Sequence, residues 1–83
     1  MKPSSIRFAQ LRHLLDDMGF SAVRQEAGWR FEHDPSETVF LFRPYRPGDP
    51  VYEHDLLLVR SQLDWRGLMP ADQFDDSLKK TPA

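Results

Sequence analysis

Three short segments with strand-like patterns follow one another in the middle of this 83-residue chain. The first is Ser21–Gln25, the second is Gly28–His33, and the third spans residues 38–43. In the second segment, aromatic side chains alternate with charged ones, which is typical of a half-buried strand. Residues 34–37 between the last two segments contain proline, aspartate and serine, which favour a turn. We therefore expect three consecutive antiparallel strands.

The third segment is apolar on both faces. Val39 and Leu41 point one way, and Phe40 and Phe42 point the other. This pattern predicts a strand that is central or covered on both sides. If helices cover only one sheet face, the other exposes an apolar strip beside Arg30, and such patches mark interaction surfaces.

Helical periodicity flanks the three strands. The first helix is expected to start at Ser4 or Ser5, with an apolar stripe that ends at Met18 and a C-terminal glycine at Gly19. A second helix is expected from Glu53 or Asp55 to Arg66, followed by Gly67. Pro70 suits the first turn of a short third helix, which Phe74 and Leu78 would dock on the domain.

The prolines of residues 44–50 and the length of the chain constrain the rest of the fold. Three prolines within residues 44–50 predict a stiff loop that is neither helix nor strand. Residues 79–83 are expected to form a frayed tail. The chain is long enough for a single domain, 1–83, with an ordered core of about 5–78. The expected fold is α+β: an α-β-β-β-α two-layer sandwich with a short C-terminal helix.

Composition narrows the possible functions. The net charge of −2 is unlike that of most nucleic-acid binders, which carry a basic stripe. No stretch is apolar enough to span a membrane, and the N-terminus lacks a signal-peptide core, so we expect a cytoplasmic protein. The absence of cysteine excludes disulfides and thiol chemistry. No histidine or carboxylate spacing predicts a metal site, and we expect no cofactor.

Several motifs in order resemble the HicA (YcfA-like) toxin family of small prokaryotic ribonucleases. They are the helix ending in Met18-Gly19-Phe20, the strand with Arg24, Trp29-Arg30-Phe31-Glu32-His33, the Pro44-Tyr45-Arg46-Pro47 loop, Leu56 to Leu63, and Gly67-Leu68 with Phe74. The resemblance covers about residues 6–78. It implies a fold like that of double-stranded-RNA-binding domains, an mRNA interferase activity, and a HicB-like antitoxin as partner.

The chain departs from this family at the catalytic position. Family members have Gly-Ser-His before the second strand, and its histidine is the catalytic residue. Here Glu26-Ala27-Gly28 stands there, so Gly28 occupies the histidine position. A positioned acid or base contributes roughly 10²–10⁴-fold to such reactions. The resemblance therefore implies a toxin scaffold with lost or weak ribonuclease activity, and no catalytic residue is assigned.

Two residues near this position are weak substitutes. His33 shares a strand face with Trp29 and Phe31, opposite to Gly28, so a structural role is the simpler interpretation. Glu26 lies on a solvated turn, where a carboxylate has a poorly matched pKa for a general base. The other histidines, His13 and His54, are expected on the surface.

Arginine and tyrosine side chains are the candidate binding residues. Between residues 24 and 46 there are four arginines and no lysine. Guanidinium groups suit phosphate or carboxylate partners, although pairing with nearby acidic residues explains them equally well. Tyr45 is expected either to stack on an RNA base or to cover the edge of the core. The candidate RNA- or partner-binding residues are Arg24, Arg30, Arg43, Tyr45 and Arg46.

Two hypotheses about function follow. The first is a HicA-like toxin-family protein that binds RNA or an antitoxin without efficient cleavage. The alternative is a non-enzymatic protein-interaction module that keeps only the fold and binds an antitoxin-like partner or a second copy of itself. An active ribonuclease with a relocated base is a third hypothesis.

Overall fold

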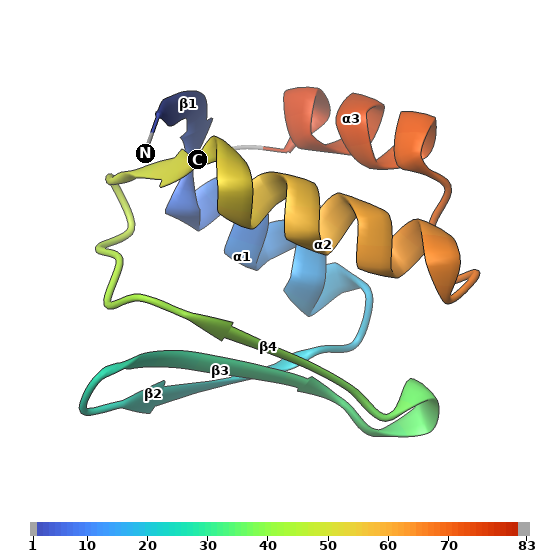
Figure 1. Cartoon of the computed structure of the whole chain (residues 1–83), viewed down its shortest axis with the longest axis horizontal. Coiled ribbons are helices and arrows are strands. Elements are labelled where there is room, and N and C mark those ends of the chain that lie inside the picture. Colours follow the sequence, from blue (N-terminus) through green and yellow to red (C-terminus); the bar gives the residue numbers. More distant parts are fainter. Residues whose placement is uncertain (1, 82–83) are drawn as a thin grey trace.

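Two antiparallel sheets and three helices make up the computed structural model, which describes residues 2–81 (Figure 1). The α+β class expected from the sequence is confirmed. In chain order the elements are β1 (Pro3–Arg7), α1 (Phe8–Asp17), β2 (Ser21–Gln25), β3 (Gly28–His33), a 3-10 turn (Asp34–Ser36), β4 (Thr38–Phe42), β5 (Pro50–Tyr52), α2 (Glu53–Trp65) and α3 (Ala71–Lys80).

The larger sheet has the strand order β2-β3-β4. Trp29 of β3 lies opposite Arg24 of β2 and Phe42 of β4, so these three side chains share one face. The strand boundaries agree with the sequence prediction except that the third strand ends at Phe42. The prediction that this strand is central was wrong. Two successive hairpins place β3 in the middle, which leaves β4 at an edge with one face uncovered.

A second sheet, formed by β1 and β5, was not predicted. The hydroxyl of Ser4 donates a hydrogen bond to the carbonyl of Val51 (2.6 Å) and accepts one from the amide of Ile6 (3.2 Å). The first helix therefore starts at Phe8, not at Ser4 or Ser5. The proline loop was also mispredicted at its end, because Pro50 is the first residue of β5, a strand position that tolerates proline.

The rest of the proline loop caps the N-terminus of α1. The amides of Phe8 and Ala9 donate hydrogen bonds to the carbonyls of Asp49 (2.8 Å) and Pro47 (2.9 Å). The side-chain oxygen of Gln10 accepts a hydrogen bond from the amide of Arg7 (2.9 Å). Amides at a helix start have no partner within the helix, so these contacts fix the loop against α1.

Helices α1 and α2 cover one face of the larger sheet, and α3 lies on their far side (Figure 1). Phe8 at the start of α1 stacks on Tyr45 (ring centroids 5.1 Å apart) and meets Phe31 edge-on (6.1 Å). The buried apolar side chains are Phe8, Leu11, Leu14, Leu15, Phe20, Phe31, Phe40, Phe42, Tyr45, Val51, Val59, Leu63, Met69, Phe74 and Leu78.

Helix α3 docks as the sequence predicts, through Phe74 and Leu78, which are both buried. Arg60 of α2 pairs with Asp75 (3.1 Å) beside them. The prediction of a frayed tail from residue 79 was wrong for Lys79 and Lys80, which belong to α3 because the apolar contacts extend to its last turn. Thr81 is held as well, since its hydroxyl donates to the carbonyl of Ser77 (2.6 Å). Residues 82 and 83 of the predicted tail lie outside the described part of the chain.

The expected α-β-β-β-α order is present, with β1 and β5 added before α1 and before α2. Two helices on one sheet face were predicted correctly. The specific likeness to a double-stranded-RNA-binding domain stays a prediction.

Candidate functional site

Gly28, the position that the resemblance assigns to a catalytic histidine, is buried at the start of β3. Its φ of +154° is unfavourable for residues with a side chain. A Cβ atom there would overlap the carbonyl oxygen of Phe42 and lie 3.0 Å from its carbonyl carbon. Close approach of two backbones therefore requires glycine at this position, and a histidine does not fit this hairpin.

The two weak substitutes lie apart from each other. Glu26 is exposed in the turn between β2 and β3. His33 is at the opposite end of β3 from Gly28, about 17 Å away at ~3.4 Å per residue. Its ring stacks on Phe20 (5.0 Å), and its Nδ1 is hydrogen-bonded with the hydroxyl of Ser36 (2.7 Å). This is a structural environment on the helix-covered face, as the sequence predicts for His33.

Arg24 is held by the β2–β3 hairpin. Its guanidinium donates hydrogen bonds to the carbonyls of Gln25 (2.6 Å) and Gly28 (2.9 Å), and lies 5.5 Å from the ring centroid of Trp29. Arg12 of α1 also lies over Trp29 (4.8 Å). The indole nitrogen of Trp29 donates to the carbonyl of Tyr45 (3.0 Å). The cation–π contact of Arg12 thus joins the sheet to α1, and the hydrogen bond of the indole joins it to the proline loop.

Arg43 and Tyr45 belong to a hydrogen-bond network around Asp55 of α2. Arg43 pairs with Asp55 (3.3 Å) and lies over the ring of Tyr52 (4.5 Å). The hydroxyl of Tyr45 donates to Asp55 (2.5 Å) and accepts from the amide of Tyr52 (3.1 Å). Burial raises the pKa of Tyr45 to about 12, and the hydrogen bond to Asp55 acts in the same direction.

This network decides between the two expectations for Tyr45. Its side chain is only 5% exposed and covers the core edge, so its ring is not accessible for stacking on a base. Arg46 is exposed like the other candidate arginines, but its contacts within residues 2–81 are made by its backbone. Its amide donates to the side chain of Asp49 (2.9 Å), and its carbonyl accepts from the amide of Asp49 (3.0 Å). The structure therefore does not bring the candidate arginines together into one basic site.

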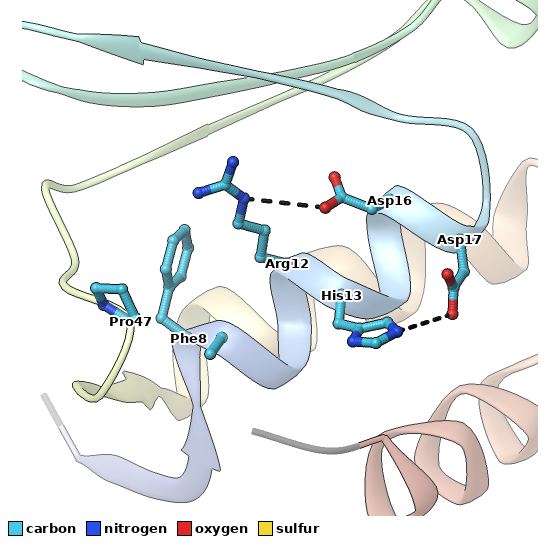
Figure 2. A pocket seen from close by; sticks show the side chains of 7 residues that line it. Phe8, Arg12, His13, Asp16, Asp17 and Pro47 are labelled. Carbon is cyan, nitrogen blue, oxygen red and sulfur yellow. Dashed lines mark ion pairs between the residues drawn. The ribbon is translucent and has the colours of Figure 1, made fainter.

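A shallow depression of about 450 Å³ lies beside α1, between His13 and Pro47 (Figure 2). Arg12 pairs with Asp16 (3.9 Å) and His13 with Asp17 (3.5 Å). Both pairs join residues four apart on one helix, and such exposed pairs contribute little to stability. Neither pair faces a buried nucleophile, so the depression has the properties of an ordinary charged helix surface.

The uncovered face of the larger sheet is the most distinctive surface. Val23, Val39 and Leu41 are between 45% and 66% exposed there. Arg30 lies in one row with Val23 and Leu41, and pairs with Glu32 in the neighbouring row. We call these five residues the open sheet face. The alternation in the third strand predicted it correctly, including the position of Arg30.

Sequence reasoning missed a second apolar surface. Leu57, Leu58 and Trp65 of α2 are exposed, and Trp65 is 80% exposed. The run of apolar residues 56–59 was a signal, because a helix with a single inner stripe buries only some residues of such a run.

Other site types receive no support. No group of histidine, aspartate or glutamate side chains within residues 2–81 is placed to hold a metal ion. In the same part of the chain, no helix has the length and apolar character needed to cross a membrane. No family model, curated protein or solved structure matches the sequence or the fold of this chain.

Proposed function

We propose that this protein is a HicA-like toxin-family member without ribonuclease chemistry, which acts by holding an antitoxin-like protein on the open sheet face. The observation that carries the proposal is the composition of that face. Three apolar side chains surround Arg30 and Glu32, which neutralise each other. A protein partner that covers this face would remove the exposed apolar area from water.

A protein partner is favoured over RNA for electrostatic reasons. RNA affinity depends on cations that neutralise phosphates. Arg24 is bound to backbone carbonyls, Arg30 is paired with Glu32, and Arg43 is paired with Asp55. The net charge of −2 also means that the molecule as a whole repels the phosphates of RNA.

The absence of ribonuclease chemistry is supported by the surroundings of three residues. Gly28 has no space for a side chain, and His33 is hydrogen-bonded on the covered face. Glu26 lies in the turn at the opposite end of β3 from His33. An acid and a base must both reach the reacting phosphate group, which this arrangement does not provide.

Titration calorimetry against the proteins encoded by the two flanking reading frames tests the proposal. We expect one of them to bind, and Val23→Asp, on the β2 side of the open sheet face, to weaken that binding at least tenfold. Leu57→Asp is the matched control, since it changes another apolar and exposed residue, on α2. No binding by either protein, or equal effects of the two variants, would overturn the proposal.

An RNA experiment separates the alternatives. The purified protein is incubated with labelled RNA at low and high salt, with cleavage and binding measured together. We expect no cleavage and only weak binding. Tight, salt-sensitive binding that Arg30→Ala and Arg46→Ala abolish would instead make the chain an RNA binder. Cleavage by the wild-type protein would show that a base lies elsewhere.

A further inference from the structure

The outer edge of β4 is open for pairing with another strand. The carbonyl of Phe42 points toward Gly28 of β3, as the overlap at that glycine shows. Successive residues of a strand direct their backbone groups to opposite sides, so those of Val39 and Leu41 point away from β3. Within residues 2–81, neither residue makes a backbone hydrogen bond outside its sheet.

This edge lacks the features that usually prevent strands from pairing. Exposed edges are commonly protected by charges, proline, bulges or very short strands. The five residues of β4, Thr-Val-Phe-Leu-Phe, contain no charge and no proline, and their pairing with β3 is regular. The opposite edge strand, β2, contains Arg24 and Gln25. The two edges of one sheet therefore differ in how well they are protected.

We propose that the occupant of this edge is a second copy of the chain, whose β4 pairs antiparallel with the first around a two-fold axis at Phe40. In this register Val39 lies opposite Leu41 of the second copy, and Leu41 opposite its Val39. The free backbone groups of β4 are those of Val39 and Leu41, so they become the hydrogen-bonded pairs of the new ladder. The interface is self-complementary, as two-fold symmetry requires.

Charge complementarity supports this register. Arg30 stands beside Leu41 and Glu32 beside Val39 within each sheet. In each row of the joined sheet, Arg30 and Leu41 of one copy are followed by Val39 and Glu32 of the other, with Val23 and Ser21 at the two ends. No row sets like charges against each other, so the second copy meets no electrostatic barrier.

On the helix-covered side of the sheet, α2 adds exposed apolar surface next to the edge of β4. It lies along β4, since Asp55 at its start pairs with Arg43, and Arg66 after its end donates to the carbonyl of Ser36 (3.4 Å). The side-chain oxygen of Gln62 accepts a hydrogen bond from the same Arg66 (3.3 Å). Leu58 and Trp65 follow Asp55 and Gln62 by three residues, which places them on the flank of α2 that adjoins β4. Both are exposed, and two-fold pairing of β4 sets them opposite the α2 helix of the second copy.

The dimer goes beyond the proposed function and does not depend on it. Pairing through the edge leaves the open sheet face uncovered and joins two such faces into one surface. Each copy contributes one five-residue strand and the exposed Leu58 and Trp65, so we expect a contact below the standard interface of about 1,600 Å² and a concentration-dependent dimer.

Sedimentation velocity on the full chain alone, from about 5 to about 500 μM, measures this dimer. Val39→Lys and Leu41→Glu each set a charge opposite an apolar residue, and each should raise the dimer dissociation constant at least tenfold. The double variant sets a lysine opposite a glutamate twice across the axis, so it should recover most of the affinity. A monomer at every concentration, or a double variant weaker than both single variants, would overturn the proposal.

A second pair of variants tests the α2 flank independently of the sheet. Leu58→Lys should weaken the dimer, whereas Leu57→Lys on the far side of the same helix should not. Acrylamide quenching of Trp65 should fall as the protein concentration rises. Equal effects of the two leucine variants would exclude α2 from the interface. Circular dichroism on each variant shows that the fold is intact, so a loss of dimer is not a loss of folding.

Discussion

The hairpin between β2 and β3 brings Gly28 so close to the β4 backbone that a side chain has no space. Packing therefore explains why glycine stands at the position that the resemblance assigns to a histidine. The resemblance alone suggests a catalytic group that was lost, whereas the packing shows a position that needs glycine. A histidine there requires a different path of the hairpin.

The first prediction is that Gly28→Ala destabilises the protein by about 3 kcal/mol, through backbone strain and overlap with Phe42. Gly28→His should be worse and should not generate ribonuclease activity. Urea unfolding measures the change in stability. The control is Gly48→Ala, because a Cβ at Gly48 meets no atom within 4 Å. A Gly28→Ala variant as stable as the Gly48→Ala variant would refute the packing argument.

The second prediction concerns Tyr45, whose pKa is raised to about 12. Between the unfolded value near 10 and the folded value, the unfolded chain loses the phenolic proton first, so stability falls as pH rises. From about pH 9 to about pH 11.5 the wild type should lose about 2 kcal/mol more than Tyr45→Phe. Urea unfolding of both proteins at the two pH values checks this. Parallel pH profiles would mean that Tyr45 does not titrate in this window.

Some residue roles followed from sequence and others did not. The period of two along a strand was enough to place His33 with Trp29 and to place Leu41 beside Arg30 on the open sheet face. The contact of Tyr45 with Asp55 was beyond such reasoning, because an irregular proline loop connects the residues and no period relates them. For the same reason the pairing of Arg43 with Asp55 emerged only from the structure.

At the scale of elements, the main departure from expectation is the small sheet of β1 and β5. Residues 3–7 adjoin a helical stripe, and nothing local distinguishes them from its first turn. Their strand conformation depends on β5, more than forty residues later in the chain. Ser4 makes this pairing specific, since its hydroxyl bonds both the carbonyl of Val51 and the amide of Ile6.

The third prediction tests that pairing. Ser4→Ala removes a partly buried hydroxyl with both bonds, and should cost about 1–2 kcal/mol of unfolding free energy. Ser5→Ala, at the exposed neighbouring position, should change stability by less than about 0.5 kcal/mol. Thermal unfolding of the two variants side by side makes the comparison. If both lose the same stability, β1 is held by its backbone alone.

At the scale of the whole molecule, Phe8 connects the two sheets. It starts α1, its amide bonds the loop before β5, and its ring packs on Trp29 and Phe42 of the larger sheet. The α+β class and the helices on one face were predictable from periodicity. The linkage through Phe8 was not, because it joins α1 to two strands and to the proline loop, which are distant in the sequence.

The fourth prediction is that Phe8→Ala costs about 3–5 kcal/mol, which approaches the total stability of a domain of this size. We expect both sheets to unfold in one transition, because Phe8 contacts the larger sheet and also the loop that precedes β5 of the smaller sheet. Circular dichroism and tryptophan fluorescence during urea unfolding should give coincident curves. Leu41→Ala, at an exposed position, serves as the control. Separate transitions would show that the small sheet is an independent unit.

The unequal edges of the larger sheet also determine whether assembly stops. If β4 pairs with β4 of another copy, both apolar edges are used and growth ends at two, because symmetry closes the contact. If β4 paired instead with β2, every copy would keep one free edge and a filament would follow. The charge and amide of Arg24 and Gln25 on β2 oppose that second arrangement. We therefore expect these polar residues to disfavour the formation of fibres.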